Sequence, residues 1–256
     1  MYKSLTITFL LFTLSACVTI NNTGKLQFPC SISDDNQTLT LSGQINQDML
    51  LCVQSHTSKP IQTVVLNSQG GAWSAGLNIA NILATFDADM VVENECNSSC
   101  ANYFIPVAKS VRINKNAYFA LHGSFDKGLL KKALLEAKTK EKEKQLVKDH
   151  QNHLMFLEKY NVPKGWFLYR TAEEYGTKSF GKHIDGKPKT WEDIKATKVL
   201  FLLVEELFIR SCLKNVKVYP FENTKVQQMY INKKIRKKIT KQGFFPTGSM
   251  RCKVAI

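Results

Sequence analysis

One apolar run constrains the fold more than any other segment of this sequence. It extends from Ile61 to Asn67 and is bounded by Pro60 before it and Gly70 after it. A continuous apolar run of this length, bounded by turn residues, is typical of a buried strand in a parallel sheet.

Apolar runs and helical periodicity alternate along the first half of the chain. We expect further strands at residues 38–43, 90–92, 110–113 and 117–121, and helices at residues 46–56 and 75–86, from near Ser98, and over 127–160. This alternation with short links predicts an α/β body with right-handed crossovers. Residues 199–204 fit a helix or a strand equally well, because periodicity does not separate the two for a short apolar run.

Three motifs stand at the ends of predicted strands. They are Asn67-Ser68-Gln69-Gly70-Gly71, Cys96-Asn97-Ser98-Ser99-Cys100 and Ala120-Leu121-His122. Together they supply a glycine loop that can offer backbone N–H groups, a serine at the start of a helix, and a histidine at the end of a strand. These are the components of a serine acyl-transfer site, namely oxyanion donors, a nucleophile and a general base.

With these motifs, residues 38 to about 125 resemble the Clp protease proteolytic subunit and its relatives in the crotonase-like superfamily. The family's Asn-Ser-Pro-Gly-Gly loop corresponds to residues 67–71, with Gln69 in place of the proline. The serine elbow between Cys96 and Cys100 is similar to the Cys-Ala-Ser-Ala-Cys frame of an exported branch of this group. The resemblance implies an α/β superhelix of strand-strand-helix units.

The same resemblance assigns roles to individual residues. It implies that Ser98 is the nucleophile and His122 the general base, with the N–H groups of Gly71 and Ser99 as the oxyanion hole. A serine at a helix N-terminus has its developing oxyanion stabilised by the positive end of the helix dipole. Ser99 is the alternative nucleophile, but it loses the register with the two cysteines.

The acid of a catalytic triad has two interpretations. In the family it precedes a Ser/Thr-x-x-Glu helix start, which Thr190-Trp191-Glu192-Asp193-Ile194 resembles, so that Asp185 is the acid. If Thr171-Ala172-Glu173-Glu174 is the corresponding start, no carboxylate precedes it at the right distance and the site is a dyad. Asp185, followed by Gly186, is equally typical of an exposed turn.

The first residues have the features of a targeting segment. Lys3 precedes an apolar stretch from Leu5 to Leu14, which is too short to span a bilayer. Leu14-Ser15-Ala16-Cys17 resembles the bacterial lipoprotein lipobox, which implies cleavage before Cys17 and acylation of its thiol. The alternative is a plain signal peptide with an incidental cysteine. We expect a lipid-anchored protein facing the periplasm, and Val18 favours the outer membrane.

Six cysteines remain after Cys17, and an even number in an exported chain indicates disulfides. Six cysteines allow about fifteen pairings, and proximity in sequence favours Cys30–Cys52, Cys96–Cys100 and Cys212–Cys252. Zinc binding is the competing interpretation, but the sequence has no Cys-x-x-Cys pair and no histidine near residues 96–100. We expect no metal and no cofactor.

The net charge of +14 is concentrated late in the chain, above all in residues 233–241. Such a basic patch suits anionic lipid or an envelope polymer, since export makes nucleic acid an improbable partner. A solvated basic helix face explains the patch equally well. The predicted divisions are a signal peptide (1–16), a polar tether (17–30), a Clp protease/crotonase-like domain (31–210) and a small basic C-terminal subdomain (211–256).

These features predict an exported lipoprotein serine hydrolase, a peptidase that cleaves a peptide or other acyl substrate in the cell envelope. The alternative is a catalytically inactive binding or scaffold lipoprotein, because folds of this group host many chemistries. The lysines along residues 127–160 suit solvent better than a ring interface. We therefore expect a monomer or a small oligomer.

Overall fold

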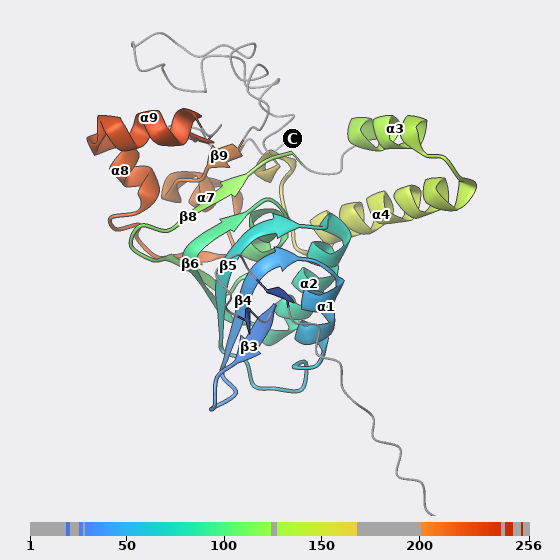
Figure 1. Ribbon diagram of the computed structural model, residues 1–256, viewed down its shortest axis with the longest axis horizontal. Coiled ribbons are helices and arrows are strands. Elements are labelled where there is room, and N and C mark those ends of the chain that lie inside the picture. Colours follow the sequence, from blue (N-terminus) through green and yellow to red (C-terminus); the bar gives the residue numbers. More distant parts are fainter. Residues whose placement is uncertain are drawn as a thin grey trace, which may run out of the picture.

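A computed structural model describes residues 19–20, 26–27, 29–123, 127–167, 201–241, 244–247 and 252. Its main feature is a nine-stranded sheet with the order β11-β9-β8-β6-β5-β4-β3, in which β7 pairs with β6 and with β10 (Figure 1). The strands are β3 (Cys30–Ile32), β4 (Thr38–Ile45), β5 (Thr63–Gly71), β6 (Asp89–Asn97), β7 (Ser110–Ile113), β8 (Tyr118–Leu121), β9 (Phe201–Leu203), β10 (Lys217–Val218) and β11 (Phe244–Pro246). A separate two-stranded pair joins β1 (Thr19–Ile20) and β2 (Leu26–Gln27).

The centre of the sheet is parallel. Strands β4, β5 and β6 run in one direction, and β6 pairs in parallel with β7 along its first half and with β8 along its second half. The edge strand β3 and the β8–β9 pair are antiparallel. The predicted α/β class with a mostly parallel sheet is therefore confirmed.

Helices α1 (Gln47–Gln54) and α2 (Trp73–Phe86) lie on the same side of β4 and β5 (Figure 1). Asn46 caps α1 by accepting a hydrogen bond from the N–H of Met49. The sheet residues alternate accordingly, since Val64 and Leu66 of β5 are buried while Asn67 is half-buried and Gln69 is exposed. The less buried face of β5 thus presents polar side chains next to the glycine loop.

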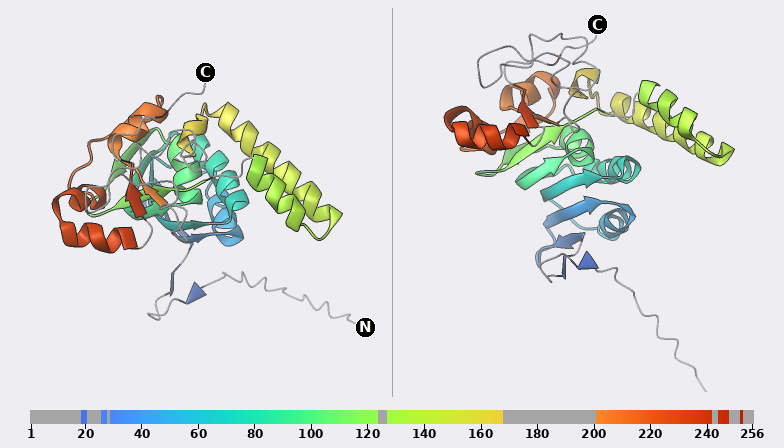
Figure 2. Two further views of the ribbon diagram at one scale, coloured as in Figure 1. Left: turned by 90° about the horizontal axis from the view of Figure 1, so that it is seen from above. Right: turned by 45° about the horizontal axis from the view of Figure 1, so that its top comes forward.

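The helix expected over residues 127–160 is in fact two helices. These are α3 (Lys127–Glu136) and α4 (Lys140–Lys159), and Thr139 caps α4 by accepting from the N–H of Lys142. A local N-cap therefore overrides the helical periodicity at this point. The pair projects from the body of the sheet (Figure 2).

The described residues after 200 contribute β9 to β11 and the helices α7 (Glu206–Cys212), α8 (Lys225–Ile231) and α9 (Lys233–Lys241). In the ambiguous segment 199–204 the described part contains the strand β9. Strands β10 and β11, which fall in the predicted C-terminal subdomain, pair with β7 and β9 in the main sheet.

All three disulfides favoured by sequence proximity are present, namely Cys30–Cys52, Cys96–Cys100 and Cys212–Cys252. Among the helices of the described residues, none combines the length and the apolar character that crossing a bilayer requires.

Candidate active site

The Ser98 elbow lies between the end of β6 and a single π-helical turn, Cys100–Phe104. Ser98 has a φ of +56°, which is uncommon for a residue with a side chain and indicates a constrained turn. Two bonds hold the turn: the Cys96–Cys100 disulfide spans it with a Cα–Cα distance of 5.2 Å, and the N–H of Asn102 donates to the carbonyl of Ser98. The helix expected from Ser98 consists of this turn and a following 3₁₀ turn, Ile105–Val107, so it is short and its dipole is correspondingly small.

The hydroxyl of Ser98 faces His122. Its Oγ atom lies 2.5 Å from Nε2 of His122, which directly follows β8. Strand pairing places the two residues side by side, because Asn97 of β6 is opposite Ala120 of β8 and the N–H of Ser98 donates to the carbonyl of Ala120. The structure therefore brings together the two residues that the sequence motifs singled out.

The surroundings of His122 favour its neutral form. Burial lowers the pKa of the imidazole, and a hydrogen bond with the backbone of Gly123 opposes this shift in part. The ring of Phe201 meets the imidazole edge to face, with 5.2 Å between the centroids. A neutral imidazole next to a serine hydroxyl is the form that accepts the serine proton.

The glycine loop reaches the serine through Gly70. A Cβ atom added to Gly70 would lie 2.5 Å from Cβ of Ser98, and the φ of Gly70 is +92°. Ser68 braces the loop, since its Oγ donates to the carbonyl of Gly43 and accepts from the N–H of Gly70. Gly70 is thus the glycine that packs on Ser98, and the motif by itself does not distinguish it from Gly71.

Gly71 and Ser99, which the resemblance assigns to the oxyanion hole, are joined to each other. The Oγ of Ser99 donates to the carbonyl of Gly71 at 2.9 Å, and Ser99 is buried. A Cβ atom on Gly71 would meet the backbone of Ile45 at 2.1 Å, so this glycine packs against β4. The hydroxyl of Ser99 is therefore directed to Gly71, whereas that of Ser98 is directed to His122.

A cleft of about 630 Å³ opens beside the elbow at the carboxyl ends of the parallel strands. Its lining residues are Gly43, Gln44, Asn67, Gln69, Gly70, Gly71 and Glu95. Ligand clefts are usual at this edge of a parallel sheet. The sequence motifs did not identify Glu95, whose only signal is its position three residues before Ser98.

Two predicted residues, the candidate acid Asp185 and the lipidation candidate Cys17, lie outside the described residues. Within the described part of the chain, no carboxylate forms a hydrogen bond with His122. The described site is therefore a serine–histidine pair.

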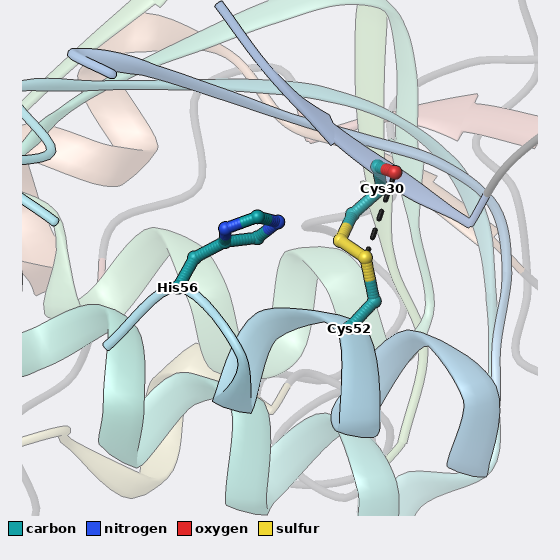
Figure 3. A group of neighbouring side chains, drawn as sticks. All are labelled: Cys30, Cys52 and His56. Atoms are coloured by element: carbon teal, nitrogen blue, oxygen red, sulfur yellow. Dashed lines mark hydrogen bonds between the residues drawn. A yellow bond between two sulfur atoms is a disulfide. The ribbon is translucent and has the colours of Figure 1, made fainter. Parts of the chain in front are cut away.

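One cluster has the composition of a metal site. A sulfur of Cys30, a sulfur of Cys52 and a ring nitrogen of His56 lie within 4.8 Å of one another (Figure 3). Nδ1 of His56 is buried and has no hydrogen-bond partner among the described residues. The two sulfurs form a disulfide, however, and thiolates rather than disulfide sulfurs are the usual metal ligands. With the Cys30–Cys52 disulfide formed, the cluster offers one ordinary metal ligand, the imidazole of His56.

No protein-family model matches this sequence, and a comparison with curated proteins finds no match. Among solved structures, the chain is similar to a mutant of ClpP1 from Listeria monocytogenes, with 17% sequence identity and a TM-score of 0.35. The similarity covers 49% of this chain and 72% of that chain. A likeness this weak carries no argument about activity, so the functional inference depends on the geometry of the site.

Proposed function

We propose that this chain is a serine hydrolase, acting as a peptidase, with Ser98 as the nucleophile and His122 as the general base. The observation that carries the proposal is the hydrogen bond between Ser98 Oγ and His122 Nε2 at a turn with positive φ. Nucleophile and base within hydrogen-bond reach, next to a cleft, are the signature of an activated serine.

The reaction follows from this arrangement. Ser98 Oγ attacks the substrate carbonyl while Nε2 of His122 accepts the serine proton. His122 then donates this proton to the leaving group, and an ester forms between Ser98 and the acyl part of the substrate. Water, deprotonated by the same imidazole, hydrolyses the ester and restores the serine. Asp185 is the proposed residue that orients His122.

The substrate carbonyl oxygen becomes negatively charged when Ser98 attacks, and hydrogen-bond donors must stabilise this charge. We propose the backbone N–H groups of Gly71 and Ser99 as these donors. The order of the motifs in a Clp protease/crotonase-like pattern supports this assignment. The N–H of Gly70, the glycine nearest Ser98, is engaged by Ser68 Oγ at 3.0 Å. It is therefore not one of the proposed donors. Among the described residues no carboxylate orients His122, and this favours a second candidate function, a non-catalytic binding or scaffold protein with the same cleft.

The proposed setting is the bacterial cell envelope. The lipobox-like segment before Cys17 supports a lipid anchor, a periplasm-facing body and an outer-membrane location. Helix α9 carries no acidic residue, which supports contact with anionic lipid or an envelope polymer. The charged surface of α4 supports a monomer or a small oligomer.

An active-site probe separates the two candidate functions. The chain without residues 1–17 is treated with a fluorophosphonate, and the adduct is located by mass spectrometry. We expect the label on Ser98, its loss in His122→Ala, and its retention in Ser99→Ala. If folded, oxidised protein is not labelled at Ser98 at any pH between 5 and 9, the non-catalytic function is the correct one.

A further inference from the structure

We propose that Glu95 makes this cleft selective for substrates that carry a positive charge, such as a lysine or arginine side chain, beside the bond that is cleaved. The inference rests on the proposed hydrolase function and specifies its substrate class.

The position of Glu95 follows from an irregularity in the sheet. Between the pairs Leu66–Val92 and Ser68–Cys96, strand β5 advances by two residues and strand β6 by four. The extra length of β6 lies immediately before the Ser98 elbow, and Glu95 belongs to it. Glu95 lines the same cleft as Gly70, the residue packed on the nucleophile.

Two donors fix the orientation of this carboxylate. The side-chain amide of Asn97 donates to Oε2 of Glu95 at 2.7 Å, and the hydroxyl of Tyr118 donates to the same oxygen at 2.8 Å. Burial and the neighbouring Glu95 raise the pKa of Tyr118 to about 12, so the phenol remains a donor at any physiological pH. Oε1 has no hydrogen bond within the described part of the chain, which leaves it available to a ligand.

The other described lining residues carry no charge. Gln44, Asn67 and Gln69 are neutral amides, and Gly43, Gly70 and Gly71 present backbone. Glu95 is therefore the one charged residue among the described residues that line the cleft, and a charge in a concave, partly dehydrated site acts more strongly than one on an open surface.

One protein cation lies near this carboxylate. Nζ of Lys225, at the start of α8, sits over the ring of Tyr118, 4.2 Å from its centroid. Lys225 and Glu95 both belong to the described residues, and they form no ion pair within 4.0 Å. Lys225 therefore reduces the negative potential at Glu95 without neutralising the carboxylate.

The test uses three fluorophosphonates of equal chain length that end in an ammonium, a methyl or a carboxylate group. The measurement is the second-order rate constant for labelling of Ser98. We expect the ammonium probe to react about fivefold faster than the methyl probe in the wild-type protein, and the carboxylate probe to react more slowly. High salt should reduce these differences, because the interaction is electrostatic.

Three variants assign the effect to Glu95. Glu95→Gln keeps the shape of the side chain and should bring the ammonium-to-methyl ratio close to one. Lys225→Met removes the competing cation and should raise the ratio. Glu93→Gln removes an exposed carboxylate from the same strand and should leave the ratio unchanged.

The outcomes separate this inference from the proposed function. Equal labelling of Ser98 by all three probes in the wild-type protein would overturn the role of Glu95 and leave the hydrolase intact. An equal loss of labelling with all three probes in Glu95→Gln would show that Glu95 only supports the elbow. If no probe reacts with Ser98 in the wild-type protein, the hydrolase fails and the selectivity fails with it.

Discussion

Ser98 Oγ and His122 Nε2 lie 2.5 Å apart, although the two residues are separated by 24 positions in the sequence. The contact depends on the parallel pairing of β6 with β8, which places the end of one strand beside the end of the other. Both side chains are supported by the same short segment, because the amide of Asn102 donates to the carbonyl of His122 while its N–H donates to that of Ser98.

Labelling of Ser98 should rise with pH, with its midpoint below the ordinary imidazole pKa of about 6.5. His122 acts as a base only when neutral, and burial lowers its pKa from the ordinary value of about 6.5. Below this pKa the imidazole is protonated and the rate falls by about tenfold per pH unit. The measurement is the labelling rate between pH 4.5 and 9, corrected for probe hydrolysis in the Ser98→Ala variant. A midpoint above pH 7 would contradict the lowered pKa.

Alanine at Gly70 should destabilise the protein more than alanine at Gly43. Both glycines have a φ near +90°, but a Cβ at Gly43 meets nothing within 4 Å, whereas one at Gly70 meets Ser98 and Asn97 below 3 Å. Gly43→Ala should therefore cost about 1–2 kcal/mol of the free energy of unfolding from backbone strain alone. Gly70→Ala should cost about 1–3 kcal/mol more from the steric overlap.

Urea denaturation measures the free energy of unfolding of both glycine variants, and Ser98 labelling of the folded fraction provides a second readout. We expect Gly70→Ala to lose labelling because the serine must move, while Gly43→Ala keeps it. Equal unfolding free energies for the two variants would show that the loop does not pack on Ser98 in solution.

Removal of Cys30–Cys52 should lower stability more than removal of Cys96–Cys100, whereas removal of Cys96–Cys100 should lower activity more. The chain-entropy estimate for the loop closed by Cys96–Cys100, with a separation of four residues, is about 2 kcal/mol. For Cys30–Cys52, with a separation of 22 residues, it is about 3 kcal/mol. Double alanine variants at each pair should follow this order in the free energy of unfolding, measured by denaturation under oxidising conditions.

Ser98 labelling should show the reverse order. The Cys96–Cys100 bond spans the elbow, so its removal should slow labelling of the folded protein, while removal of Cys30–Cys52 should leave the rate unchanged. An unchanged rate without Cys96–Cys100 would mean that backbone hydrogen bonds alone hold the elbow.

The lipid anchor at Cys17 is tested by metabolic labelling with a palmitate analogue in a bacterial host. We expect label in the wild-type chain and none in Cys17→Ala, because the thiol is the proposed acylation site. Several acyl chains hold a protein durably in a membrane, so the variant should also leave the membrane fraction. Equal label in both chains would exclude this anchor.

Much of the architecture could be predicted from local patterns. The run from Ile61 to Asn67 lies within β5, and the α/β class and the three disulfide pairs are as expected. Hydrophobic periodicity and proximity in sequence carry this information because each strand and each short loop is a local unit. The single helix expected over residues 127–160 was wrong, since the cap at Thr139 outweighs the periodicity of the flanking residues.

The sequence by itself determined the candidate residues of the site, Ser98 and His122, and the strand ends on which they lie. Only the tertiary structure decided that their side chains meet, that Gly70 is the glycine against the nucleophile, and that Glu95 lines the cleft. These relationships depend on the register between strands and on the extra residues in β6. Register is set by packing and hydrogen bonding between segments far apart in the chain, and no pattern within one segment encodes it.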